Sequence, residues 1–257
     1  MKRSSIFCDW LDVTCHPENS FLVPLRLFLM MHSFEPFIGG EGREVYRVGE
    51  GTIHFDFKMS FHRSSVSGSS IRALEADGLW RDYLNVLGSV PHTVTRNDLA
   101  VDLYVDSPAF LRDLEGKYPD DNFSFTRKSL RVLRVYSSRV SDGALTGTWY
   151  AGHRSKSSIT CRVYDKQNEM LEKHGQHIEP TTRIELTFRK GIRTSLFDVI
   201  YPDDLFYHTA SPELISKPGH DVYPWVSKGT DCWVSTSSAF ELLSIDNYTR
   251  AVERSEA

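Results

Sequence analysis

The 257-residue sequence predicts an α+β fold with a central, mainly antiparallel sheet backed by helices. Several predicted strands follow one another with few strand–helix–strand units between them, and this order favours antiparallel pairing. Hydrophobic residues make up 40% of the chain and charged residues 25%, the balance of an ordinary globular protein. A chain of this length can bury a large core in one main domain.

The first half of the chain contains strand and helix patterns in turn. Residues 9–15 resemble an opening strand, and the mostly apolar segment 21–32 a buried helix that is too short to span a membrane. Glycines and charged residues predict a turn at 39–51. Residues 52–61 alternate apolar and polar side chains as a half-buried strand does. A Ser/Gly loop is expected at 64–70, followed by one helix over 70–87.

The second half is richer in strand patterns. Strands are expected at 93–105 and 182–188, with one or two more within 123–136, and a hairpin of 146–151 and 158–164 is joined by the loop 152–157. Helices are expected at 108–115, 165–174 and 237–253, the second of them ended by a glycine. The signals weaken after residue 196. We therefore divide the chain into a domain of residues 1–195 and a C-terminal extension of residues 196–257.

Charge is distributed unevenly along the chain, and the cysteines are scattered. The formal net charge is −4, yet residues 127–166 contain nine Lys or Arg against two acids. Such a basic stretch is typical of nucleic-acid contact, although solvated basic surfaces are also common. The four cysteines form no CxxC pair and no secretory signal precedes them, so neither zinc nor disulfides are predicted. A reducing cytoplasm is the expected location.

Two predicted strands carry carboxylates and arginines on one face. Alternation along 95–104 places Arg96, Asp98 and Asp102 on the same side. Two such aspartates facing the interior would need a cation, and a hard ion such as Mg²⁺ or Mn²⁺ is one candidate. An exposed sheet face with an Arg–Asp pair is the alternative. Arg183 and Glu185 repeat the pattern in 182–188, and Glu185 joins the aspartates if the strands are neighbours; it could equally form a cross-strand ion pair.

The predicted hairpin carries basic residues and ends in a tyrosine. Arg154 and Lys156 in its loop could donate to phosphate oxygens, although polar hairpin tips are common. Tyr164 ends the second strand on the same face as Arg162, where a residue at the edge of the core is the ordinary interpretation. Taken together, carboxylates, arginines and a strand-end tyrosine are the parts needed to cleave a phosphodiester without water.

Five segments, in order, resemble the replication initiation factor family of rolling-circle plasmids and filamentous phages, which is related to relaxases of conjugative transposons. They are Cys8–Thr14, Val66–Glu75, the Arg-x-Asp-x-Ala-x-Asp strand Arg96–Asp102, the hairpin and nucleophile segment Gly147–Glu169, and the Arg-x-Glu strand Arg183–Leu186. The ordered set covers about residues 5–192 and is far more specific than any single motif.

The resemblance implies a site-specific DNA nicking enzyme that starts rolling-circle replication by forming a 5′-phosphotyrosine link. Tyr164 would be the nucleophile, and Lys166 and Arg183 would assist catalysis. The implied metal ligands for Mg²⁺ or Mn²⁺ are Asp98, Asp102 and Glu185. The implied DNA-binding residues are Arg96, Arg154, Lys156 and Arg162. The fold would be similar to that of His-hydrophobic-His endonucleases, although this sequence contains no His-x-His pair, so carboxylates would hold the metal.

The same resemblance implies origin DNA, a host helicase and DNA polymerase as partners, a second copy of the chain in a homodimer, and no membrane. Two other functions stay open. One is a relaxase that nicks a transfer origin to mobilise an element. The other is a non-catalytic DNA-binding regulator whose carboxylates are structural, and it predicts that Tyr164→Phe leaves function intact.

Overall fold

The computed structural model describes residues 2–39, 43–117, 126, 132–153, 156–189, 192, 194–211 and 214–215. The chain divides into two compact units, Met1–Ser211 and Pro212–Ala257. Every helix and strand described below belongs to the first unit, which includes the helices α6 (Leu196–Ile200) and α7 (Pro202–Thr209). This unit ends at Ser211, and both the division at residue 195 and a separate role for residues 196–257 stay predictions.

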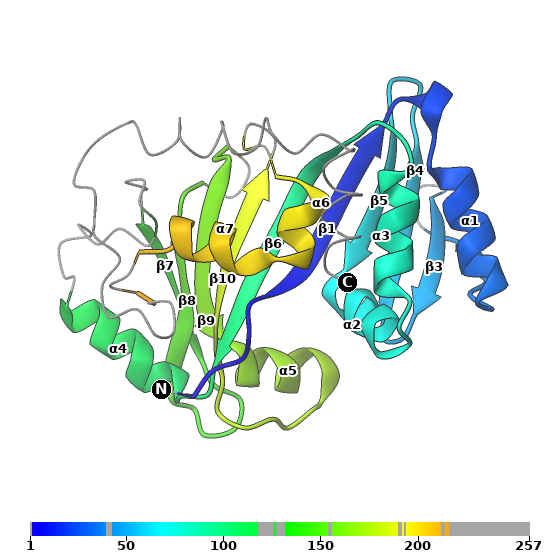
Figure 1. Ribbon diagram of the computed structural model, residues 1–257. Helices are drawn as coiled ribbons and strands as arrows, with labels where there is room; N and C mark the ends of the chain where they lie inside the picture. Colours follow the sequence, from blue (N-terminus) through cyan, green and yellow to red (C-terminus); the bar gives the residue numbers. More distant parts are fainter. Residues whose placement is uncertain are drawn as a thin grey trace, which may run out of the picture. The chain divides into compact units, whose positions relative to one another are not determined.

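The described strands form one ten-stranded sheet in the order β2-β3-β4-β5-β1-β6-β10-β9-β8-β7 (Figure 1). Every neighbouring pair is antiparallel, which confirms the predicted α+β class with an antiparallel sheet. The strands are β1 (Phe7–Cys15), β2 (Pro36–Ile38), β3 (Glu44–Val48), β4 (Gly51–Phe57), β5 (His62–Ser67), β6 (His92–Leu103), β7 (Val132–Ser138), β8 (Leu145–Ala151), β9 (Ile159–Asp165) and β10 (Thr182–Arg189).

Helices back this sheet. Figure 1 shows α2, α3, α6 and α7 in front of the strands and α5 below the ends of β9 and β10. No helix in the described part of the chain is long and apolar enough to cross a membrane. The remaining elements are the short 3-10 helix η1 (Pro17–Asn19) and the helices α1 (Leu22–Met31), α2 (Gly68–Ala76), α3 (Trp80–Gly88), α4 (Ser107–Lys117) and α5 (Lys166–His174).

The central strands separate apolar and charged side chains onto two faces, as their alternation predicts. Leu99 and Val101 of β6 and Ile184 and Leu186 of β10 are fully buried on one face. Helix α6 contacts β6 and adds Leu196 to the core. The charged residues of both strands alternate with these positions and therefore lie on the opposite face. One face of the central strands therefore packs into the apolar core, and the opposite face carries the charged side chains.

Two predicted loops are strands instead. The segment expected as a turn contains β3, which pairs with β4, and its last residue, Gly51, begins β4. The expected Ser/Gly loop contains β5, which pairs with β1 and β4. Ser64 of β5 is 1% exposed and its hydroxyl lies 2.6 Å from the Tyr83 hydroxyl, so a polar residue is satisfied inside the fold.

The single helix predicted over 70–87 is two helices. Gly78 has a φ of +71°, a left-handed conformation that glycine adopts readily, and it separates α2 from α3. The predicted helix at 237–253 and the first part of the predicted strand region 123–136 lie outside the described residues, apart from Thr126. The later part of that region is β7.

Candidate active site

The centre of the sheet brings together strands that are far apart in the sequence. Tyr164 of β9 lies opposite Arg183 of β10, and Arg183 lies opposite Asp102 of β6. In the next row Arg162 lies opposite Glu185. Directly paired residues carry their side chains on the same face of a sheet. The two carboxylate-bearing strands are therefore neighbours, which the sequence had left open.

Tyr164 is the penultimate residue of β9 and is 5% exposed. The Arg162 guanidinium stacks over its ring, 4.2 Å from the ring centroid. Burial raises the pKa of the Tyr164 phenol well above its ordinary value, while the charges of Arg183 and Arg162 act in the opposite direction. The phenol is therefore protonated in this arrangement, and it needs a proton acceptor before it can attack.

Arg183 links the tyrosine to two aspartates. Its Nε and Nη2 donate to the Asp102 carboxylate at 2.6 and 2.8 Å. Its Nη1 faces Asp9 Oδ2 at 3.1 Å without forming a hydrogen bond. Burial works against the charged guanidinium, but Asp102 and Asp9 more than compensate and raise the pKa of Arg183. The Arg183 guanidinium therefore keeps its positive charge in the position opposite Tyr164.

Glu185 lies in the same group of charges. It is 5% exposed, and Arg162 Nη2 donates to its Oε2 at 2.5 Å. Burial raises the pKa of Glu185, and the charges of Asp98 and Asp9 raise it further, while Arg162 lowers it. Carboxylates crowded in this way hold a proton more readily than exposed ones.

Asp98 completes this face on β6. It is 2% exposed, and it accepts a hydrogen bond of 2.9 Å from Arg96 Nε together with a second contact from Arg96 Nη2. The Arg96 guanidinium also lies over the Trp10 ring, 4.9 Å from its centroid. Burial raises the pKa of Asp98, whereas Arg96 lowers it.

The three carboxylates predicted as metal ligands share this face, but each binds a different arginine. The pairs are Asp98–Arg96, Asp102–Arg183 and Glu185–Arg162. Among the described residues, no group of three or more His, Cys, Asp or Glu side chains is arranged to hold a metal ion. The role of these carboxylates as Mg²⁺ or Mn²⁺ ligands stays a prediction.

Lys166 begins helix α5, directly after the tyrosine strand. Its Nζ lies 2.7 Å from Glu169 Oε2, and Glu169 also binds Lys173 at 2.7 Å. Burial and the nearby charge of Arg183 lower the pKa of Lys166. Burial alone would raise the pKa of Glu169, but the two lysines lower it to about 2. The structure therefore pairs Lys166 with Glu169 at the start of α5, and its catalytic role stays a prediction.

The predicted DNA-binding residues fall into two places. Arg96 and Arg162 lie on the charged face described above. Lys156 is exposed in the β8–β9 loop, at the opposite end of β9 from Tyr164. Arg154, in the same loop, lies outside the described residues. The structure thus separates Lys156 from the tyrosine.

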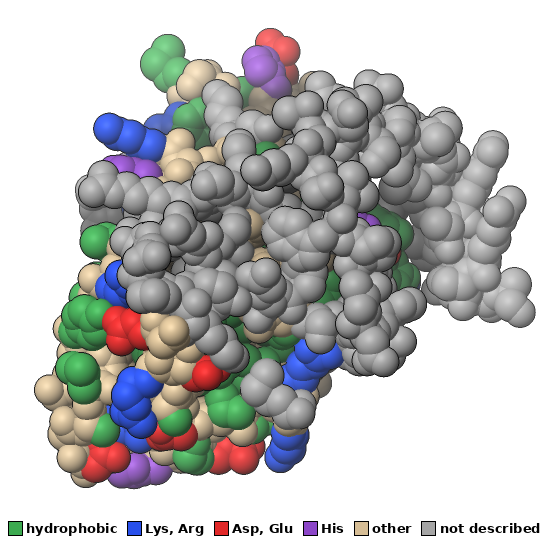
Figure 2. Space-filling view, turned by 90° about the vertical axis from the view of Figure 1, so that its left-hand side faces the viewer, with side chains coloured by type: hydrophobic (Ala, Val, Ile, Leu, Met, Phe, Trp, Pro, Cys, Tyr) green, Lys and Arg blue, Asp and Glu red, His purple; other side chains and the backbone are tan. Residues whose placement is uncertain are grey.

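Part of the basic stretch of residues 127–166 lies within the described residues, and several of its basic side chains are paired with acids there. The acids come from other elements: Arg139 binds Asp106 at 2.9 Å, and Arg162 binds Glu185. On the described part of the face in Figure 2, acidic and basic side chains lie side by side. Among the described residues of this stretch, Arg139 and Arg162 therefore do not present unpaired charge.

No protein-family model matches the chain, and no curated protein sequence matches it either. Among solved structures, the fold is similar to that of a rolling circle replication initiator protein from Geobacillus stearothermophilus. The two chains are 20% identical, with a TM-score of 0.50, over 79% of this chain and 80% of the other. At this level of identity the likeness shows a shared fold.

Sequence reasoning gave no role to Asp9 or Glu169. Asp9 sits where the β1–β6 register shifts between Cys8 and Trp10, and this irregularity brings its carboxylate to Arg183 and Arg72. A Cβ on Gly68, the first residue of α2, would lie 2.3 Å from Asp9 Oδ1. The signal in the sequence is the Ser67–Gly68 pair at the start of α2, since a glycine at a helix start permits close approach.

Proposed function

We propose that this chain is a rolling-circle replication initiator, which nicks one strand of origin DNA with Tyr164 as its nucleophile. One observation carries the proposal: a buried tyrosine lies between two arginines, Arg162 stacked on its ring and Arg183 opposite it in register. The fold shared with a rolling circle replication initiator protein supports the same function. The family resemblance of the sequence supports it independently.

The proposed reaction is a transesterification. The Tyr164 oxygen attacks the scissile phosphorus, the Tyr–O–P bond forms, and the bond from phosphorus to the 3′ oxygen breaks. The products are a 5′-phosphotyrosine and a free 3′-OH that serves as a primer. Glu185 is the proposed acceptor of the phenol proton, because it is buried and bound to Arg162, whose guanidinium lies over the Tyr164 ring, and its pKa is raised. Lys166, whose pKa is lowered, would protonate the leaving oxygen.

The arginines would bind the phosphate. Guanidinium groups form paired hydrogen bonds with phosphate oxygens and offset the charge that develops in the transition state. Arg183 is held in place by Asp102, so its orientation is set before DNA arrives. Mg²⁺ or Mn²⁺ belongs to the proposal on the resemblance alone, and no step of the reaction above depends on a metal.

The partners and location follow from the same proposal. Origin DNA is the substrate, and a host helicase and DNA polymerase would extend the free 3′ end in the bacterial cytoplasm. Arg96 and Lys156 would contact the DNA backbone on either side of the nick, where phosphate contacts set the position of the strand. A homodimer is the proposed assembly, and no membrane takes part.

The proposal is tested by incubating the full chain with supercoiled DNA carrying its origin and Mn²⁺ or Mg²⁺. We expect nicked circles with protein attached to the 5′ end, and loss of both in Tyr164→Phe. Tyr150→Phe is the matched control, because Tyr150 lies opposite Arg162 on β8 yet is not the proposed nucleophile. Nicking that survives Tyr164→Phe would exclude this tyrosine. DNA binding without nicking in the wild-type chain would support a non-catalytic regulator.

A further inference from the structure

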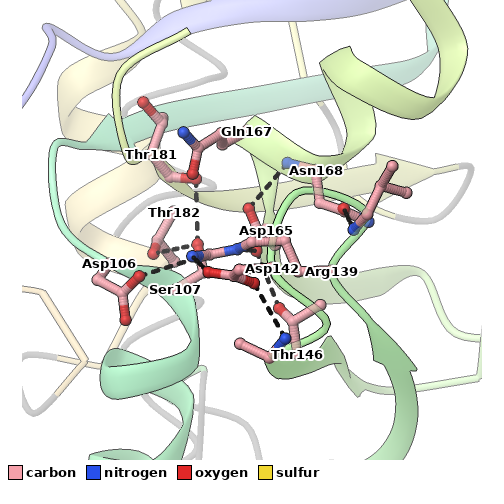
Figure 3. Close-up of polar contacts among 12 residues, drawn as sticks. Asp106, Ser107, Arg139, Asp142, Thr146, Asp165, Gln167, Asn168, Thr181 and Thr182 are labelled. Atoms are coloured by element: carbon pink, nitrogen blue, oxygen red, sulfur yellow. Dashed lines mark hydrogen bonds and ion pairs between the residues drawn. The ribbon is translucent and has the colours of Figure 1, made fainter. Parts of the chain in front are cut away.

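Arg139 forms a buried cluster outside the charged face of the sheet. It follows β7, and its side chain is 8% exposed. Three acids surround it: Asp165 at 3.0 Å, Asp106 at 2.9 Å and Asp142 at 3.5 Å (Figure 3). A buried arginine is strongly destabilising unless acids pair with it, and these three acids compensate the charge of Arg139.

The central partner of Arg139 is Asp165, the residue directly after Tyr164. One carboxylate oxygen of Asp165 accepts from Arg139 Nε and from Thr146 Oγ1, both at 3.0 Å. The other accepts from the Asn168 backbone N–H at 3.0 Å and caps the N-terminus of α5. Successive residues of a strand point to opposite faces, so this cluster lies on the face of the sheet away from the Tyr164 ring.

The turn after β7, which carries Arg139, makes a second contact with the start of α5. The Val140 backbone N–H donates to Asn168 Oδ1 at 2.7 Å. On the other side of the junction, the Lys166 N–H donates to the Thr181 carbonyl at 2.9 Å, just before β10 begins. Ser107 of α4 donates to that carbonyl at 3.1 Å (Figure 3). The turn after β7 and the residue before β10 thus bind the β9–α5 junction, and α4 supports it through Thr181.

We propose that Arg139 is a positioning residue, which acts through Asp165 to fix Tyr164 and Lys166 at the β9–α5 junction. The inference rests on the proposed nicking function. Arg139 does not contact the charged face, so it affects the reaction through the backbone on either side of Asp165. A displacement of about 1 Å in a reacting group reduces a rate by about 100-fold. Loss of Arg139 therefore slows the attack by Tyr164 without removing the groups that bind DNA.

The test compares Arg139→Gln, Arg139→Lys and Asp165→Asn with the wild-type full chain. Asp165→Asn keeps a residue that can cap helix α5 but removes the charge that binds Arg139. This variant provides the test if Arg139→Gln does not fold. The measurements are the rate of covalent-complex formation at saturating origin DNA and the Kd for that DNA. Circular dichroism verifies that each variant is folded. Asp142→Asn is the matched control, because Asp142 is 52% exposed and its contact with Arg139 is the longest of the three.

We expect a fall of about 100-fold in the rate for Arg139→Gln, partial recovery in Arg139→Lys, and a Kd within about twofold of the wild type. Asp142→Asn should match the wild type in both. An unchanged rate in a folded Arg139→Gln or Asp165→Asn would overturn the inference, as would a parallel loss of DNA affinity. A wild-type chain that forms no covalent complex would instead overturn the proposed function itself.

Discussion

Arg183 on β10 and Asp102 on β6 lie opposite each other in register and share two hydrogen bonds, of 2.6 and 2.8 Å. The arginine side chain is 4% exposed and the aspartate side chain 19%. The pair spans the two central strands of the charged face, next to Tyr164. It therefore fixes the direction of a guanidinium and joins the strands at the same time.

Breaking this pair is expected to cost stability as well as activity. Arg183→Ala leaves Asp102 and Asp9 without their shared cation, and loss of one member of a buried pair typically costs about 3–5 kcal/mol. Urea unfolding of the full chain measures the change. Arg72→Ala is the control, since Arg72 is 50% exposed and contacts Asp9 at 3.3 Å, so its loss should cost less than about 1 kcal/mol. Equal losses in the two variants would contradict this prediction.

Gly68→Ala is expected to destabilise the chain by about 1–3 kcal/mol, because the added Cβ would lie 2.3 Å from Asp9 Oδ1 and 2.7 Å from the Asp9 carbonyl oxygen. Thermal unfolding provides the measurement. Gly116→Ala in α4 is the matched control, since a Cβ there meets nothing within 4 Å. Alanine favours a helix by about 0.5–1 kcal/mol over glycine, so this control should gain stability. A neutral Gly68→Ala would show that Asp9 moves freely.

The Glu169 carboxylate is expected to make stability depend on acid pH. The pKa of Glu169 is about 2 in the fold, against an ordinary value of 4.5, so its contribution is complete above 4.5 and is lost as the pH falls towards 2. From pH 7 to pH 3 this loss is on the order of 2 kcal/mol. Urea unfolding at the two pH values should show a difference that shrinks by this amount in Glu169→Gln. Glu172→Gln, on the same helix, should retain the wild-type difference.

Removal of divalent cations is expected to leave the fold intact, because arginines already neutralise the three carboxylates of the charged face. The melting temperature should be the same with EDTA as with Mg²⁺ or Mn²⁺. Nicking is measured in parallel, since the family resemblance implies that it needs the cation. A melting temperature that rises with added Mg²⁺ would show a resident site in the fold, and nicking in EDTA would contradict the metal requirement.

The periodic segments of the sequence predict most of the fold correctly. The alternation in 93–105 and 182–188 was sufficient to identify β6 and β10 and the charged face of each strand, whereas their pairing came from the structure. Strand β5 could not be predicted in this way, because its serines are buried by partners such as Tyr83 that lie far away in the sequence. Polar residues indicate a loop until their hydrogen-bond partners are known.

Which charged side chains form ion pairs also depends on the register between neighbouring strands. Arg183 and Glu185 alternate in one strand, yet each binds a residue of a neighbouring strand: Arg183 binds Asp102, and Glu185 binds Arg162. The sequence shows which side chains share a face, but only the cross-strand register determines which arginine neutralises which carboxylate. The contact of Asp9 with Arg183 could not be predicted from the sequence, because it depends on the irregular pairing of β1.

The proposed nicking centre also depends on where its strands come from. Asp9, Asp98, Tyr164 and Glu185 enter from β1, β6, β9 and β10, so the centre exists only once segments from nearly two hundred residues of chain have paired. Pairing of such distant segments is a late and slow event in folding. A chain whose synthesis has not yet reached β10 therefore carries Tyr164 and Arg162 without Arg183 and Glu185. Formation of the proposed nicking centre would therefore require the complete pairing of β1, β6, β9 and β10.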